Sequence, residues 1–271
     1  MTRKGLSRAA MALAIALFQT QAAAQNRSRP TLHINPRWDE CSFQLDRSLT
    51  QAAWRQFTEE AGLVVYFRPL ADARPMGRGN FEVSMLQWQT NIDDADAAWN
   101  DTFVHPDSTH WLYEGSGLKF PGLLFRAGVT AKTDVGLYVT KNIDANYGFV
   151  GGQVQRSLFE STERTWAAAA RASFVMLYGP EDLDFTLYGL DVVASRKWNL
   201  TTWASVSPYA GVATYLASSH ETTAAVDLDD ERVIGAHGTV GAVMELSKAR
   251  LALEYSAAKV GTFSLKVGIG W

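Results

Sequence analysis

The segment FSLKVGIGW, residues 263–271, decides the fold class, because apolar residues occupy every second position and small or polar residues fill the others. Successive side chains of a β-strand point to opposite faces, so this strand would have one apolar and one polar face. Such a strand suits the wall of a barrel with lipid outside and a polar interior. The apolar positions are Phe263, Leu265, Val267, Ile269 and Trp271.

The same alternation recurs upstream in segments of roughly ten residues separated by turn residues, which is typical of transmembrane strands. We predict strands near residues 80–90, 118–128, 133–142, 146–158, 164–178, 183–196, 200–216, 232–246, 249–258 and 261–271. The predicted fold class is all-β: a closed antiparallel up-and-down transmembrane β-barrel of about ten strands, an even number as bacterial barrels usually have. The apolar run Leu63–Leu70 is expected to be a rim or plug segment, or half of an extra pair that gives the alternative of twelve strands.

An exported soluble β-sandwich is the competing fold, since it would also alternate. Sandwich strands commonly have about five or six residues, whereas lipid-spanning strands need about nine to eleven, so the segment lengths favour the barrel. Aromatic residues near predicted strand ends suit the girdles of a membrane barrel. They include Trp88, Trp166, Trp198, Trp203, Tyr178 and Tyr209.

The N-terminus has the order of a signal peptide. Arg3, Lys4 and Arg8 form a basic region, Met11–Phe18 an apolar region, and Ala22–Ala24 a cleavage site. We therefore predict three parts: residues 1–24 are a signal peptide, residues 25–78 are a lead-in with a short helix, and residues 79–271 are the transmembrane β-barrel. No later stretch has the roughly 18 apolar residues that a spanning helix needs.

The lead-in contains one predicted helix. Ser48 and Gln51 form a capping-box pattern, apolar residues follow at helical spacing, and Gly62 is expected to end the helix. Its apolar face would plug the lumen or pack on the periplasmic rim. Cys41 is the only cysteine, so no internal disulfide is possible, and a structural thiol is expected there.

Loop lengths predict which end of the barrel faces outward. Outer-membrane barrels have short periplasmic turns and longer extracellular loops. If Trp271 ends in the periplasm, the short turns near residues 131–132, 197–199 and 247–248 are periplasmic. The long connections 91–117 and 217–231 then both fall outside.

The last strand, Phe263–Trp271, resembles the C-terminal β-signal of outer-membrane proteins, which ends in an aromatic residue after alternating apolar positions. The segment Gly77–Val83 is similar to the opening strand of small uncharacterised outer-membrane barrels, several of them described as transporters. The resemblance implies the outer membrane of a Gram-negative-type bacterium. It also implies outer-membrane lipid, lipopolysaccharide and the barrel-assembly machinery as partners.

No catalytic set stands out in the sequence. Barrel lipases and deacylases carry a His and a Ser two residues apart, and the chain has no His-x-Ser. We therefore expect no enzyme, no cofactor and no metal. The net charge is −3 with interspersed signs, so no basic stripe marks nucleic acid as a partner.

One predicted outer loop combines aromatic residues with possible metal ligands. His105 and His110 with an aspartate would ligate a divalent metal, and the tryptophans would stack on a sugar or phenolic ring. The alternative is a folded loop that satisfies its own turns. The outer-loop binding candidates are Trp99, Asp101, His105, Asp107, His110 and Trp111. The acidic run 227–231 in the second long loop is expected to be solvated or to bridge lipopolysaccharide through divalent cations.

The polar face of the strands carries charges of both signs. These residues would line a path for a small solute or form a closed network, because a small barrel is nearly filled by its own side chains. Glu254 and Lys266 are expected to pair across neighbouring strands. The lumen-lining candidates are Glu82, Asp134, Arg171, His237, Glu245, Glu254 and Lys266. The predicted function is a narrow channel or transporter for small solutes, with a non-conducting structural or adhesive barrel and the exported sandwich as alternatives.

Overall fold

The computed structural model describes residues 41–93, 95–104, 118–141, 145–163 and 165–271. Ten of its strands form one closed antiparallel ring in which each strand pairs with its neighbours along the chain. The first and last strands of the ring close it, with Phe263 opposite Gln89 and Ile269 opposite Val83. The strands are β2 (Phe81–Thr90), β4 (Leu118–Gly128), β5 (Thr133–Lys141), β6 (Gly148–Glu160), β7 (Trp166–Tyr178), β8 (Leu183–Arg196), β10 (Ala204–Glu221), β11 (Glu231–Leu246), β12 (Ala249–Ala257) and β13 (Thr262–Gly270).

This ring confirms the predicted up-and-down barrel, and the sandwich alternative is wrong because a sandwich has two sheets with open edges. The predicted strand 200–216 lies at Ala204–Glu221 instead, since residues 198–203 form the turn that contains the short β9 (Trp198–Asn199). In the part of the chain that the structure describes, no helix is long and apolar enough to cross a membrane.

An apolar belt surrounds the barrel, because the outward positions of the strands carry large apolar side chains. Members on separate strands are Val83, Leu123, Leu137, Leu190, Val212 and Leu253, all more than one third exposed. Exposed aromatic residues, including Phe81, Trp166, Trp198, Trp203 and Trp271, lie near the end of the barrel that holds the C-terminus. A belt with an aromatic border is the surface of an outer-membrane barrel.

Two of the six residues predicted to form the aromatic girdle do not lie on the outer surface of the barrel. Trp88 and Tyr209 stand at inward positions of β2 and β10, and both are buried. Their position near a strand end did not decide their orientation, because the side of the sheet is set by period 2.

The N-terminal segment is folded at and inside the barrel. β1 (Ser42–Phe43) pairs with β3 (Phe103–Val104) from the β2–β4 connection, next to the short helix α3 (Ala97–Asn100). The helix α2 (Gln51–Val65) begins at the N-cap Thr50, not at Ser48, because the Ser48 side chain bonds Asp46 and Asp101 instead. It also continues past Gly62, so the apolar run after Gly62 ends the helix and then extends, without adding an eleventh strand.

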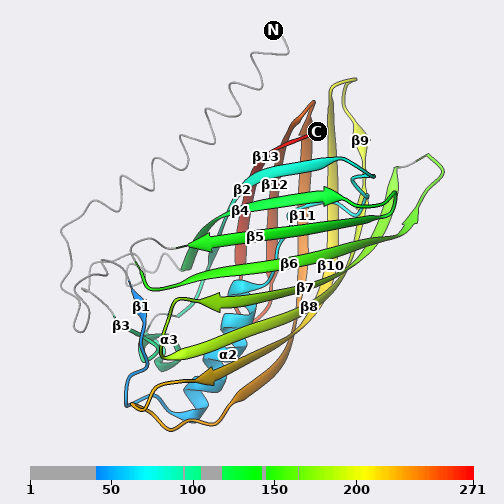
Figure 1. Cartoon of the computed structure of the whole chain (residues 1–271). Helices are drawn as coiled ribbons and strands as arrows, with labels where there is room; N and C mark the ends of the chain where they lie inside the picture. The colour runs from blue at the N-terminus through cyan, green and yellow to red at the C-terminus, as the bar shows by residue number, and fades with distance from the viewer. Residues whose placement is uncertain (1–40, 94, 105–117, 142–144, 164) are drawn as a thin grey trace.

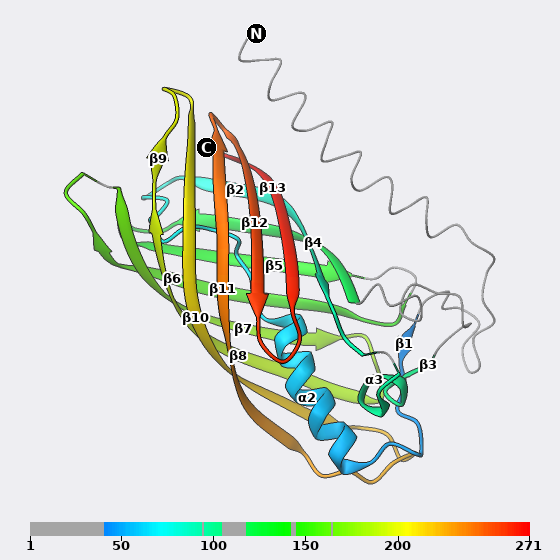
Figure 2. The same ribbon diagram turned by 180° about the vertical axis from the view of Figure 1, so that it is seen from behind.

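The structure places α2 within the ring of strands, in the half of the barrel away from the C-terminus (Figures 1 and 2). It packs on β10 and β11, and ten of its residues are buried. A Cβ on Gly62 would meet the ring of Tyr215 and would lie 3.1 Å from the Ala217 Cβ, so glycine permits the close approach of helix and wall. The helix therefore lies in the lumen and not on the rim. We call α2 and the extended segment 66–76 that follows it the plug.

Candidate functional site: the filled lumen

All seven predicted lumen-lining residues point into the barrel. Six of them are buried, and the Glu245 side chain is 23% exposed near the end of the barrel that holds Trp271. The structure does not gather them around open water. It divides the lumen into a charged end beside Trp271, a mixed middle and an apolar half at the opposite end. We call the first end periplasmic and the second outer, as expected from the short turns of the first.

Glu82 is the centre of the charged periplasmic end. Its carboxylate lies 2.6 Å from Lys266 Nζ, 2.8 Å from Arg250 Nη1 and 3.8 Å from Arg126 Nη1. Arg126 also lies 3.5 Å from Asp134. Each of the buried charges around Glu82 thus has an opposite charge within 4 Å, which offsets the cost of its burial.

Glu245 extends this network toward the periplasm and to the plug. Its carboxylate lies 2.8 Å from Lys197, 3.5 Å from Arg250 and 3.7 Å from Arg74. Arg74 comes from the extended segment that follows α2 and also pairs with Asp72. The network therefore joins the wall to the plug at this end.

The predicted pairing of Glu254 with Lys266 is wrong. In the β12–β13 register Glu254 stands opposite Ser264, and Lys266 stands opposite Ala252. Lys266 bonds Glu82 on the other neighbouring strand, while Glu254 accepts a hydrogen bond of 2.8 Å from Tyr209. Lys266 therefore takes its partner from β2, the first strand of the barrel, which pairs with the last strand β13 when the ring closes.

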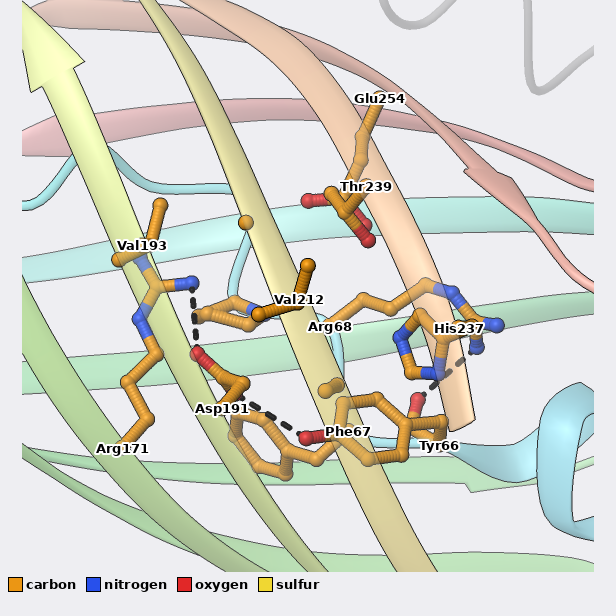
Figure 3. Close-up of a pocket in the computed structure, with 13 residues that line it drawn as sticks. Tyr66, Phe67, Arg68, Arg171, Asp191, Val193, Val212, His237, Thr239 and Glu254 are labelled. Carbon is orange, nitrogen blue, oxygen red and sulfur yellow. Dashed lines mark hydrogen bonds and ion pairs between the residues drawn. The ribbon is translucent and has the colours of Figure 1, made fainter. Parts of the chain in front are cut away.

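A small polar pocket occupies the middle of the lumen (Figure 3). Asp191 accepts from Tyr66 Oη at 3.1 Å and pairs with Arg171 at 3.6 Å. Arg68 donates to the Tyr66 carbonyl at 3.0 Å, and His237 lies edge-on against the Tyr66 ring. The pocket has room for about one water molecule, which is too small for a solute.

Side chains of the wall bind the backbone of the extended segment between α2 and β2. Lys266 donates to the Pro69 carbonyl at 3.1 Å and Arg171 to the Ala71 carbonyl at 2.6 Å. Asp134 accepts from the Met76 amide at 3.0 Å. Two of the predicted lumen cations are thus bound to the plug as well as to acidic wall residues.

The outer half of the lumen is an aromatic core. Phe57 of α2 stacks on Trp54 at 5.5 Å and meets Trp99 edge-on at 5.2 Å. Phe43 packs on Phe103 at 4.3 Å between ring centroids. These residues join α2 to the wall and to the cap formed by β1, β3 and α3.

The outer-loop candidates are only partly described. Trp99 is buried and donates to Glu60 at 2.6 Å, so it has no free face for a sugar. The Asp101 carbonyl accepts from the Asp46 amide at 2.8 Å. His105, Asp107, His110 and Trp111 lie outside the described residues, and within the described ranges no group of three possible metal ligands occurs.

The second long connection contacts the helix. Glu231 pairs with Arg55 at 2.8 Å and accepts from Gln51 at 2.6 Å. Asp230 pairs with His220 at 2.6 Å. Part of the acidic run 227–231 is therefore engaged in contacts within the protein.

Two ionisable groups at the outer mouth have shifted pKa values. The Ser48 backbone amide and hydroxyl donate to Asp46 and lower the pKa of its carboxyl. Partial burial opposes protonation of Lys259, but its hydrogen bonds to Glu59 and Glu60 and the charges of these two carboxylates together outweigh this and raise the pKa of the ammonium. Both shifts favour the charged forms that tie the mouth together.

Sequence reasoning missed several cations of the lumen. Arg126 and Arg250 occupy inward positions of β4 and β12, so the alternation of these strands contained the signal that would have found them. Arg68 and Arg74 belong to the plug, which has no period to reveal an inward face.

No protein-family model matches the chain, and no curated protein sequence matches it significantly. Among solved structures, Ail, the attachment invasion locus protein of Yersinia pestis, has 14% identity and a TM-score of 0.29, covering 72% of this chain and 99% of that one. The β domain of the Bordetella autotransporter BrkA has 14% identity and a TM-score of 0.38, covering 72% and 100%. The N-terminal barrel of Pseudomonas aeruginosa OprF has 11% identity and a TM-score of 0.29, covering 72% and 99%. At these scores the likeness supports no statement about activity, and the barrel assignment rests on the strand pairing.

Proposed function

We propose that this outer-membrane β-barrel is a sealed, non-conducting barrel with a structural or adhesive role at the cell surface. The observation that carries the proposal is the continuous filling of the lumen by α2 and the segment that follows it. Wall contacts accompany this chain from Gln51 at one mouth to Met76 near the other. Each of the two pockets beside it in the described part of the chain has room for about one water molecule at most.

The plug behaves as the core of the barrel. Trp54, Phe57, Leu63, Val64 and Val65 are buried against the outer half of the wall. Burying one large apolar side chain stabilises by about 1.5–3 kcal/mol, so moving the helix into water would cost on the order of 10 kcal/mol. The closed arrangement is therefore strongly favoured.

The charges of the lumen support the same proposal. In an open pore the inward charges would face water and select ions. Here Glu82, Asp134, Arg171 and Lys266 are buried and engaged with one another, with other wall residues or with the plug backbone. They contribute to the closed packing of the protein.

The outer end of the barrel presents a folded surface. β1, β3 and α3 cover part of this mouth, and Asp46, Arg47 and Glu181 are exposed there. A covered mouth on a sealed barrel suits contact with other surfaces.

The test is conductance of the folded protein in planar lipid bilayers. We expect no steady open-pore steps and no solute flux in liposome swelling, with the shift in gel migration on boiling as the control for folding. A matched variant, Trp54→Ala with Phe57→Ala, removes packing from the plug and is expected to give brief, irregular openings. Steady conductance of the unaltered protein would overturn the proposal.

A narrow channel or transporter is the second candidate. The polar and charged wall of the periplasmic half favours it, because release of the plug would leave a hydrophilic lining. This candidate requires a partner or solute that opens the barrel, so solute-dependent conductance in the same bilayers would select it.

A further inference from the structure

We infer that the barrel transfers the N-terminal part of its own chain across the outer membrane. The segment in the lumen then anchors this part at the cell surface. The inference depends on the path of the chain from Cys41 to Gly79. It holds whether or not the barrel conducts.

The path begins at the outer mouth, where residues 42–45 contact three different outer connections. The Gln44 amide donates to the Thr102 carbonyl at 3.0 Å in the β2–β4 connection. Asn146, between β5 and β6, bonds the Phe43 amide and carbonyl, each at 2.8 Å. The Leu45 amide donates to Asp182, between β7 and β8, at 3.1 Å.

The first turns of α2 are held at the same mouth. Gln51 donates to the Asp229 carbonyl at 3.1 Å and Arg55 pairs with Glu231, both at the β10–β11 connection. Lys259, in the β12–β13 connection, lies 3.0 Å from Glu59. With the β2–β4, β5–β6 and β7–β8 contacts, all five connections at this end of the ring touch the N-terminal segment.

The chain then descends through the barrel. Tyr138, in the middle of β5, donates to the Val65 carbonyl at 3.2 Å. Near the other end, the Ala73 amide donates to Ser195 at 3.1 Å and the Met76 amide to Asp134, close to the periplasmic ends of β8 and β5. The contacts therefore move in one direction along the strands.

The chain leaves the lumen at the periplasmic end and turns into β2. Gly79 donates to the Gly128 carbonyl at 2.9 Å, and the next strand begins beside Trp271, whose amide donates to the Phe81 carbonyl at 2.9 Å. Gly77 and Gly79 have φ values of 82° and 84°, which favour glycine in this reversal.

The number of times the chain crosses the membrane determines on which side each end of the described chain lies. The ten strands of the described ring return the chain to the side on which β2 begins, and the lumen segment adds one more crossing. Residues 41–49 and Trp271 therefore lie on opposite sides of the membrane. With short turns periplasmic, residues 41–49 are at the cell surface. Polypeptide that precedes them has to pass the membrane during assembly, before α2 packs in the lumen.

Cysteine labelling tests this topology in the full chain. In a Cys41→Ala background, single variants Arg47→Cys and Arg55→Cys probe the outer start of the plug. Glu181→Cys probes an outer connection and Lys132→Cys the β4–β5 turn, and all these positions are exposed. A membrane-impermeant maleimide is applied to intact cells and to cells with a permeabilised outer membrane.

We expect Arg47→Cys, Arg55→Cys and Glu181→Cys to be labelled in intact cells, and Lys132→Cys only after permeabilisation. If Glu181→Cys reacts in intact cells but Arg47→Cys and Arg55→Cys do not, the path of the chain through the lumen is overturned. If Lys132→Cys reacts in intact cells and Glu181→Cys does not, the orientation is reversed and the inference also fails. The gel shift on boiling restricts the comparison to folded variants, and the bilayer conductance separately decides the sealed state.

Discussion

The Glu82–Lys266 ion pair dominates the lumen at the scale of single residues. Both side chains are 1% exposed and their charged atoms lie 2.6 Å apart. Lys266 also donates to the plug at the Pro69 carbonyl. A buried charge without its partner is strongly unfavourable, so Lys266 depends on Glu82, whereas Glu82 also contacts Arg250 and Arg126.

Replacing Lys266 therefore tests the charged end of the lumen. We expect Lys266→Met to lower the free energy of unfolding by about 1.5–3 kcal/mol, because it removes a charged hydrogen bond from Glu82, which keeps Arg250 and Arg126. The measurement is the urea midpoint of the protein folded in lipid vesicles.

Lys259→Met is the matched control, because Lys259 is 42% exposed and its nearer partner Glu59 is 40% exposed at the outer mouth, with Glu60 farther away at 3.4 Å. An exposed pair contributes about 0–1 kcal/mol. Equal midpoints for the two variants would show that the buried network does not stabilise the fold.

The inward orientation of Glu82 and Lys266 followed from alternation in the sequence, but their pairing did not. The two residues are at opposite ends of the barrel sequence, and only the closure of β13 on β2 brings them together. The sequence suggested the neighbour on β12 instead, since adjacent segments are the obvious partners.

At the scale of elements, the helix α2 meets β10 at Gly62. The ring of Tyr215 and the methyl group of Ala217 occupy the space that a larger residue would need. Tyr215 also donates to the Glu59 carbonyl at 2.8 Å, so its ring is held in place. The close contact fixes the helix against the wall.

Gly62→Ala tests this contact. Alanine favours a helix over glycine by about 1 kcal/mol. Overpacking costs about 1–3 kcal/mol, so we expect a net loss of stability and a lower urea midpoint.

Gly238→Ala is the control, because a Cβ at that position of β11 meets nothing within 4 Å. An unchanged or raised midpoint for Gly62→Ala would mean that the helix sits less tightly in the lumen than the structure has it.

The strands were easier to predict than this helix. Most predicted strand boundaries lie within a few residues of the observed ones, because alternation and turn residues are local signals. The predicted end of the helix at Gly62 was wrong, since the wall stabilises the turn that follows. Local propensity is overridden by such packing.

At the scale of the whole molecule, the apolar belt places the barrel in the bilayer. Leu190 lies in the middle of β8 and is 60% exposed on the outer surface. The belt is continuous around the ring, so lipid is the solvent for this surface.

A charge in the belt tests this placement. We expect Leu190→Arg to destabilise the protein in lipid vesicles by about 2–4 kcal/mol, because arginine near the bilayer midplane is unfavourable. Ala257→Arg, at the outer end of β12, should cost about 0–1 kcal/mol. A similar cost at both positions would contradict the position of the belt, and the folded fraction at each urea concentration gives the comparison.

The barrel, its strand order and the inward face of most strands could be predicted from the sequence. A strand has period 2, so its sequence records which side is apolar. It also indicated a helix in the lead-in and a set of inward charges. The site candidates Glu82, Asp134, Arg171, His237, Glu245, Glu254 and Lys266 all came from this period.

That the lumen is filled, and by which residues, emerges only when all the strands and the N-terminal segment fold together. The segment Tyr66–Met76 has no regular period. It binds the wall through its backbone and through the side chains of Tyr66 and Arg74, so no pattern in its sequence indicates its position. Ring closure joins residues from the two ends of the barrel sequence, and the plug adds contacts to all sides of the wall at once. A sequence pattern describes neighbours along one strand, whereas the contents of a closed space depend on every strand around it.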